Sequence, residues 1–99
     1  MHASIVEMTL RLPVDETLFE ELRADFLRRA SRHTGFCGFQ YVLGARGHAI
    51  GILWYDHAED LDAITEEVGS WFHDHISPRL ADPETNVTRG QVVVDLTRP

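Results

Sequence analysis

The stretch "GFCGFQYVLGARGHAIGILWYD", residues 35–56, decides the fold. It contains two runs, 35–43 and 48–56, that are both rich in the branched and aromatic residues that favour strands. Only the few residues around "ARG" separate them, which is enough for a turn and too little for a helix. The stretch therefore predicts an antiparallel β-hairpin.

A strand and a helix are predicted before the hairpin. Residues 4–12, "SIVEMTLRL", alternate between apolar and polar side chains, with Val6, Met8, Leu10 and Leu12 on one face, and Pro13 ends the run. Asp15 then caps a helix, and Gly35 is expected to stop it. The helix carries an apolar stripe at helical spacing, formed by Leu18, Leu22, Phe26 and Ala30.

A second helix and a last strand are predicted after the hairpin. The helix begins near Asp60 and carries Leu61, Ile64, Val68, Trp71 and Phe72 on one side. Ser77 and Pro78 begin a short further helix, 81–90 form a loop, and "QVVVDL", residues 91–96, forms the last strand. The order β-α-β-β-α-β predicts one α+β domain over residues 1–99, a ferredoxin-like fold with a four-stranded antiparallel sheet.

Both faces of this sheet are predicted to need burial. The runs "YVL", "ILWY" and "VVV" are apolar at consecutive positions, whereas two helices cover only one face. Because a large exposed apolar surface normally marks an interface, a second sheet from another subunit is the simplest cover. The sequence therefore predicts a homodimer.

Composition limits the partners and the compartment. The formal net charge of −7 argues against nucleic acid, since binding the phosphate backbone needs a basic face. The basic cluster Arg28, Arg29, Arg32 and His33 falls in the last turns of the first helix, where cations interact favourably with the helix dipole. No apolar run is long enough to cross a bilayer and the first residues do not resemble a signal peptide, so a cytoplasmic protein is expected. The single cysteine, Cys37, suits a reducing compartment and is expected in the core.

The motif "FHDH", residues 72–75, holds two candidate functional histidines. At about 100° per residue, His75 falls in the apolar stripe of the second helix and His73 points away from it. Residues two apart on a helix diverge by about 200°, so the pair cannot bind one metal ion unless the helix unwinds, for example at Gly69. No metal site is therefore expected.

His75 has two possible roles. An imidazole facing the sheet could accept a proton from a phenolic substrate near neutral pH. The alternative is a buried histidine that is bonded to a backbone carbonyl or a carboxylate. The aromatic residues are equally ambiguous, because Tyr41, Trp54, Trp71 and Phe72 could line a ligand pocket or simply form the core.

Two segments resemble the antibiotic biosynthesis monooxygenase-like domains of the dimeric α+β barrel superfamily. They are "TGFCGFQYVLG", residues 34–44, and "ILWYDHAEDLDAI", residues 52–64, and the resemblance spans nearly the whole chain. It implies a homodimer whose sheets form a barrel, with a small-molecule pocket between sheet and helices. The activities it implies include cofactor-independent oxygenation of aromatic polyketides or quinols and oxidative haem degradation.

The resemblance also allows some residues to be compared. The haem-degrading branch uses an asparagine, a tryptophan and a histidine, at positions aligned with Thr9, Ile64 and His73 here. Two of these three differ, which disfavours haem breakdown. The Asn/Trp/Tyr arrangement of the anthrone-oxygenating branch has no convincing counterpart in this chain.

The leading prediction is a small-molecule enzyme, a cofactor-independent monooxygenase acting on a phenolic, quinol or polyketide-like aromatic substrate. His75 is the predicted catalytic base, with His73 as the candidate favoured by the family alignment. The predicted substrate contacts are Thr9, Tyr41, Trp54, Ile64, Trp71 and Phe72. Two other readings remain open: a dimeric binding protein without catalysis, and a structural dimer whose own side chains fill the pocket.

Overall fold

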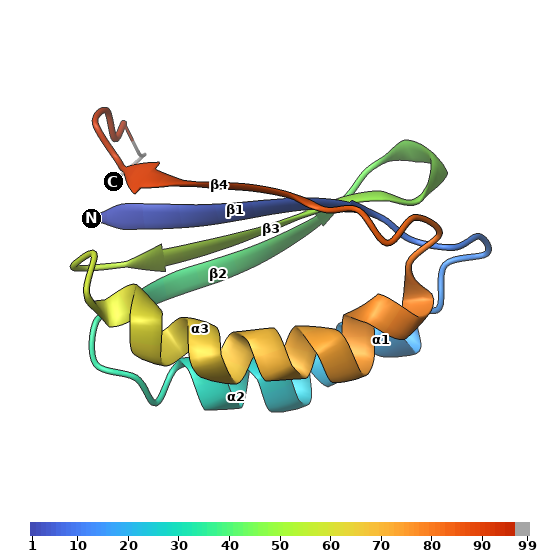
Figure 1. Cartoon of the computed structure of the whole chain (residues 1–99), viewed down its shortest axis with the longest axis horizontal. Coiled ribbons are helices and arrows are strands. Elements are labelled where there is room, and N and C mark those ends of the chain that lie inside the picture. The colour runs from blue at the N-terminus through green and yellow to red at the C-terminus, as the bar shows by residue number, and fades with distance from the viewer. Residues whose placement is uncertain (97–99) are drawn as a thin grey trace.

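The computed structural model describes residues 1–96 and shows one antiparallel sheet with helices on a single face (Figure 1). The strands are β1 His2–Thr9, β2 Phe36–Leu43, β3 His48–Tyr55 and β4 Asn86–Gln91. Across the sheet they lie in the order β2-β3-β1-β4. The helices are α1 Thr17–Glu21, α2 Leu27–Ala30 and α3 Asp60–Trp71. The predicted ferredoxin-like α+β fold and the β2–β3 hairpin are confirmed.

The first helical segment is continuous but not uniform. A π-helical turn, Leu22–Phe26, joins α1 to α2. The N-cap is Glu16, one residue after the predicted Asp15, and Asp15 accepts a hydrogen bond from the Thr17 backbone N–H at 3.1 Å in the turn before α1. The helix ends at Ala30, so the prediction that Gly35 stops it was wrong. Gly35 instead has a φ of +90° in the turn before β2, a conformation that favours glycine.

The second helical segment also widens. α3 continues through Gly69 without a break and passes into a π-helical turn, Phe72–Ile76. A short 3₁₀ turn, Ser77–Arg79, follows as predicted. Because a π turn holds more residues than an α turn, a helical wheel drawn at 100° per residue misplaces side chains after Trp71.

The last strand lies earlier than predicted. β4 occupies Asn86–Gln91, so it overlaps the predicted strand only at Gln91 and otherwise lies in the segment expected to be a loop. It pairs with β1 in a register that sets Gln91 opposite His2. The last hydrogen bond along this pair runs from the Val92 N–H to the Met1 carbonyl at 2.9 Å. Residues 93–96 lie outside the strand, and Val93 and Leu96 are 83% and 92% exposed.

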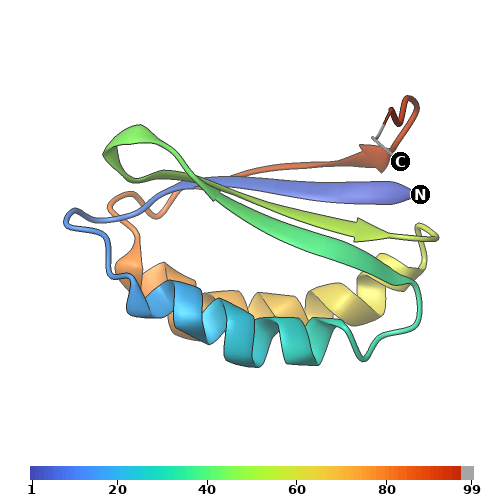
Figure 2. The same ribbon diagram turned by 180° about the vertical axis from the view of Figure 1, so that it is seen from behind.

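The core lies between the sheet and the helices. Figures 1 and 2, seen from opposite sides, both show the helices on one face of the sheet. β1 alternates as predicted, with Met8 and Leu10 buried, but Leu12 is exposed. On β3 the alternation turns Ala49, Leu53 and Tyr55 towards the helices. The helices contribute Leu18, Leu22, Phe26, Ile64, Trp71 and Ile76 to this core.

The opposite face of the sheet has no helix over it. Strand alternation and pairing place Ile5, Ile50, Ile52 and Trp54 together on this face, where each is half-buried. Trp54 lies against Gly38 of the neighbouring strand β2. This open sheet face is apolar at its centre, as the sequence predicted.

Two other expectations concern the surface. Cys37 is exposed and not in the core, because the β2–β3 register shifts between Phe36 and Gly38 and leaves Cys37 without a partner in the ladder. Its thiol lies against Asp56, and burial and this carboxylate raise the pKa of the thiol. None of the helices within residues 1–96 has the length and apolar composition needed to cross a membrane.

Candidate functional site

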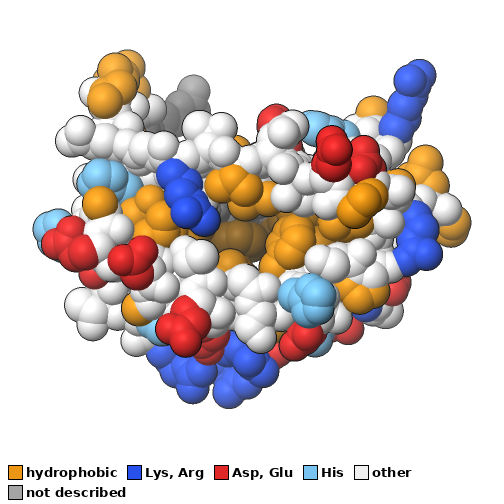
Figure 3. All heavy atoms as spheres, in the orientation of Figure 1, with side chains coloured by type: hydrophobic (Ala, Val, Ile, Leu, Met, Phe, Trp, Pro, Cys, Tyr) orange, Lys and Arg blue, Asp and Glu red, His pale blue; other side chains and the backbone are white. Residues whose placement is uncertain are grey.

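A cavity lies under β4, on the face of the sheet that the helices cover. α3 packs Leu61 and Ile64 against Leu53 and Tyr55 of β3, and it does not cover β4, whose residues are all exposed. The result is a hollow with an apolar floor between α3 and the β4 edge of the sheet (Figure 3). The volume of this cavity is about 190 Å³.

The wall of the cavity is mainly apolar. Its larger apolar side chains include Met8, Phe39, Leu53, Val68, Trp71 and Phe72. The polar side chains that line it are Ser4, Tyr41, Thr65, Thr85 and Arg89. Among the described residues, the lining therefore contains no histidine, aspartate or glutamate.

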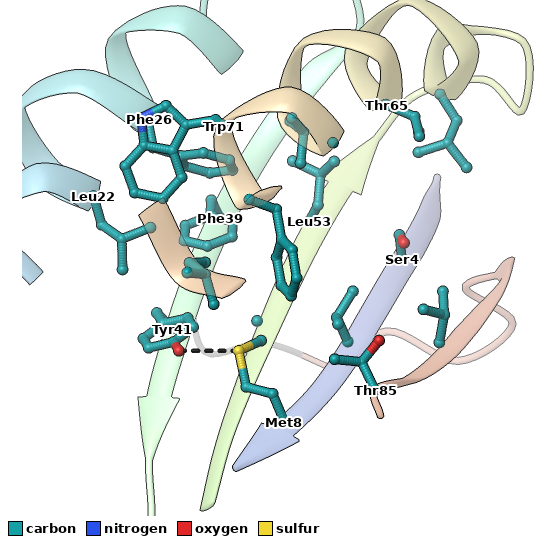
Figure 4. Close-up of a pocket in the computed structure, with 18 of the residues that line it drawn as sticks. Ser4, Met8, Leu22, Phe26, Phe39, Tyr41, Leu53, Thr65, Trp71 and Thr85 are labelled. Atoms are coloured by element: carbon teal, nitrogen blue, oxygen red, sulfur yellow. Dashed lines mark hydrogen bonds between the residues drawn. The ribbon is translucent and has the colours of Figure 1, made fainter. Parts of the chain in front are cut away.

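Tyr41 provides a hydrogen-bond donor at one end of the cavity (Figure 4). Its hydroxyl donates to the Met8 Sδ at 3.2 Å, and burial raises the pKa of Tyr41 to about 12. The phenol is therefore protonated at neutral pH. Because a thioether is a weak acceptor, a ligand oxygen would compete well for this hydroxyl.

Trp71 is held rigidly in the wall. Its indole N–H donates to the Asp25 Oδ2 at 2.9 Å, and its ring packs edge-on against Phe26. The hydrogen bonds from Arg29 and then from Trp71 lower the pKa of Asp25 to about 2, so this acceptor stays ionised. The orientation of the indole is thus fixed from outside the cavity.

His75 lies behind Trp71 and does not line the cavity. Its imidazole stacks on the Trp71 ring with centroids 4.3 Å apart, and its Nδ1 lies 3.3 Å from the Glu21 Oε2. Its side chain is 32% exposed. It points from the π turn Phe72–Ile76 towards Glu21 at the end of α1 and not towards the sheet. The partner is a carboxylate, one of the two kinds expected for a structural histidine.

Arg79 organises the groups around His75. Its guanidinium donates to the Glu21 Oε2 at 2.8 Å, to the His75 carbonyl at 2.7 Å and to the Asp15 Oδ2 at 3.0 Å. The hydrogen bond from Arg79, followed by that from His75, lowers the pKa of the Glu21 carboxyl against the opposing effect of its partial burial. This network ties the start of α1 to the end of the second helical segment.

The other predicted site residues separate into two groups. Tyr41, Trp71 and Phe72 line the cavity. Trp54 is on the opposite face of the sheet, Thr9 pairs with His48 at the far end of β1, and neither lines the cavity. Ile64 is fully buried in the core, and His73 is exposed on the π turn.

Four polar residues of the lining were not predicted from the sequence as site residues: Ser4, Thr65, Thr85 and Arg89. Ser4 has the same parity along β1 as Val6 and Met8, so the alternation already placed it on their face. Arg89 was missed because 81–90 were expected to be a loop. Within residues 1–96, no three His, Cys, Asp or Glu side chains come together in a way that could hold a metal ion.

Comparison with solved structures identifies the fold. A Nitrosomonas europaea protein provisionally described as an antibiotic biosynthesis monooxygenase superposes with a TM-score of 0.76 at 18% identity, over 93% of this chain and 89% of that one. A monooxygenase of Streptomyces coelicolor in complex with the ligand nanaomycin D gives 0.71 at 12% identity, over 97% and 92%. The chain has the fold of the antibiotic biosynthesis monooxygenase-like proteins.

A dimeric ferredoxin-like protein from an uncultured marine organism has the same fold, with a TM-score of 0.74 at 15% identity over 99% of this chain and 92% of that one. The predicted resemblance to this group of structures is thus confirmed at the level of the fold. No family model and no curated protein matches the sequence. Identities this low leave the chemistry to be argued from the cavity itself.

Arg79→Gln should destabilise the protein by about 1–2 kcal/mol, because charged hydrogen bonds to Glu21 and Asp15 are lost at a largely covered side chain. Arg23→Gln is the matched control, since Arg23 pairs only with Glu20 and both side chains are more than two-thirds exposed, at 68% and 76%. Urea unfolding at pH 7 measures both. Equal free energies of unfolding for the two variants would contradict the role given to Arg79.

Proposed function

We propose that the chain is a small-molecule enzyme that binds a flat aromatic substrate in the cavity between α3 and β4. The observation that carries the proposal is the cavity itself: an apolar hollow with a few polar groups at its ends, open beside an uncovered edge strand. The fold supports it, because the solved structures that share it include a monooxygenase with a bound ligand.

The size of the cavity limits the substrate. About 190 Å³ is below the range of roughly 300–1,000 Å³ that is usual for drug-sized ligands. It exceeds a cavity of about 150 Å³ that is known to take up benzene. A substrate of one to three fused rings, partly exposed at the mouth beside β4, suits this volume. Phe39, Trp71 and Phe72 provide faces and edges for stacking.

The reaction proposed is oxygenation without a cofactor. An electron-rich phenol or quinol that loses a proton can give electrons to dioxygen directly. The substrate for this step is an anthrone-like phenol, whose keto tautomer carries a ring methylene. That methylene is oxidised to a carbonyl: one oxygen atom of dioxygen forms the new C=O bond, and the other leaves as water with the two hydrogens of that carbon. In this proposal Tyr41 donates a hydrogen bond to a substrate oxygen, and the apolar wall keeps bulk water from the anion.

His75 is the proton acceptor in this proposal. Glu21, which contacts the Nδ1 atom, would orient the ring and stabilise the imidazolium, as a carboxylate does for a general base. Since His75 is outside the lining and stacked behind the Trp71 ring, the proton has to reach it through water molecules around the edge of that ring. His73 is the alternative base but lies further into solvent.

A second candidate function is ligand binding without catalysis. The observation that favours it is the absence of a histidine or carboxylate from the cavity lining within the described residues. A site built only of apolar side chains, hydroxyls and one guanidinium can hold a ligand more readily than it can remove a proton. Turnover, as opposed to saturable binding alone, distinguishes the two.

The proposed enzyme is a homodimer that buries the open sheet face. This face presents Ile5, Ile50, Ile52 and Trp54, and a second copy presents the same surface in return. A structure with the same fold is described as a dimeric ferredoxin-like protein. We propose a cytoplasmic location for the protein, since a single cysteine suits a reducing compartment.

Native protein should consume oxygen with hydroquinones or anthrone-like phenols faster than the same compounds autoxidise. Thr65→Phe should lower the rate at least tenfold, because the ring fills the cavity from α3. Ser70→Phe, on an exposed position of the same helix, is the matched control. His75→Ala should reduce the rate by 10²-fold or more, as expected for loss of a general base, and His73→Ala should not.

Three outcomes of this assay are informative. Equal loss in Thr65→Phe and Ser70→Phe would contradict the location of the site. A rate unchanged by His75→Ala would remove His75 from the proposed mechanism. Saturable binding of these compounds with no oxygen uptake would favour the non-catalytic alternative.

Ile52→Lys should convert the dimer to a monomer, because it places a charge at the centre of the open sheet face. Glu66→Lys, on the exposed side of α3, is the control and should leave the dimer intact. Sedimentation equilibrium measures both. A dimer that survives Ile52→Lys unchanged would show that another surface joins the subunits.

A further inference from the structure

We propose that one end of the cavity, formed by Arg89, Ser4 and Thr65, recognises an acidic group, so that the ligand is an aromatic carboxylic acid and not a neutral aromatic. This inference rests on the proposed function, because it names the chemical class of the molecule bound in the same cavity. We call these three residues the acid-binding end.

Strand pairing brings two of the three together. Ser4 of β1 lies directly opposite Arg89 of β4, so both side chains are on the face of the sheet that the helices cover. Ser4 is buried, with 7% of its surface exposed. Thr65 reaches the same cavity from α3, and Figure 4 shows Ser4 and Thr65 on the side away from Tyr41. Arg89, Ser4 and Thr65 therefore line the same cavity, with Ser4 and Arg89 side by side across the β1–β4 pair.

Arg89 is available for a ligand. Five arginines in the described part of the chain form ion pairs with acidic side chains: Arg23, Arg28, Arg29, Arg32 and Arg79. Arg89 forms none with any described residue, although the chain carries a formal net charge of −7. Burial raises the pKa of Tyr55, and the positive charge of Arg89 partly opposes this rise.

The opposite end of the cavity is neutral. Continuing the register by one residue beyond Glu7 and Asn86 sets Met8 near Thr85, and Tyr41 donates to the Met8 sulfur there. The apolar pair Val6 and Val87 lies between the two ends. Ser4 and Met8 are four residues apart on one strand, a span of about 13 Å. The cavity is thus a slot with a cation at one end, an apolar middle and neutral donors at the other.

This arrangement favours a single carboxylate. A guanidinium binds a carboxylate through two parallel hydrogen bonds, and the hydroxyls of Ser4 and Thr65 can add a third. A multiply charged anion would be repelled by a protein of net charge −7 and would meet one cation only. The ligand class is therefore a flat acid with a hydroxyl or carbonyl group at its far end.

The test uses 6-hydroxy-2-naphthoic acid and its methyl ester, which carries one additional methyl group and no charge on the group expected at Arg89. Calorimetric titration of the native protein at pH 7 and low salt should show the acid binding at least tenfold more tightly than the ester. Arg89→Gln should weaken binding of the acid about tenfold and leave the ester within twofold. Arg46→Gln, on the β2–β3 turn away from the cavity, should change neither ligand.

The salt dependence provides a second readout. Raising the salt concentration should weaken binding of the acid to the native protein and leave its binding to Arg89→Gln nearly constant, because screening acts on the ion pair. An acid-to-ester ratio that survives Arg89→Gln would overturn the acid-binding end alone. If neither compound binds the folded native protein, the aromatic cavity of the proposed function fails, and the acid-binding end fails with it.

Discussion

The packing of α3 on β3 is the contact on which the rest of the structure depends. Leu61 and Ile64 meet Leu53 and Tyr55, and this contact fixes the helix over the middle of the sheet and not over β4. The edge strand is therefore uncovered on its inner face, and the cavity forms beneath it. None of the described helices covers the outer face of the sheet, whose apolar centre suits the proposed contact with a second subunit.

Much of the fold could be predicted because its inner strands carry strong patterns. The hairpin and the alternation of β1 were recognisable, since apolar side chains on one face must be buried. β4 could not be recognised in this way, because every residue of "NVTRGQ" is exposed and the segment has no alternation of buried and exposed side chains. The run "VVVDL" has the stronger strand propensity, but the β1–β4 register covers Asn86–Gln91 and places this run beyond the paired residues.

The site was harder to predict, for reasons specific to a few residues. Tyr41, Trp71 and Phe72 were expected at the pocket and line it. Trp54 was expected beside them, but both faces of β3 are apolar, so composition could not tell which face meets the helices. His75 was placed by a wheel that assumed an α-helix, whereas the π turn carries it to Glu21 and out of the cavity lining.

The central claim is that ligands bind between α3 and β4 and not on the open sheet face. Amide chemical-shift mapping by NMR, with 2-naphthol titrated into labelled protein, tests this claim most directly. Binding in the cavity should give saturable shifts at Val6, Val68, Phe72 and Val87, with little change at Ile5 and Ile52. Shifts concentrated on Ile5, Ile52 and Trp54, or no saturable shift at the cavity residues, would contradict it.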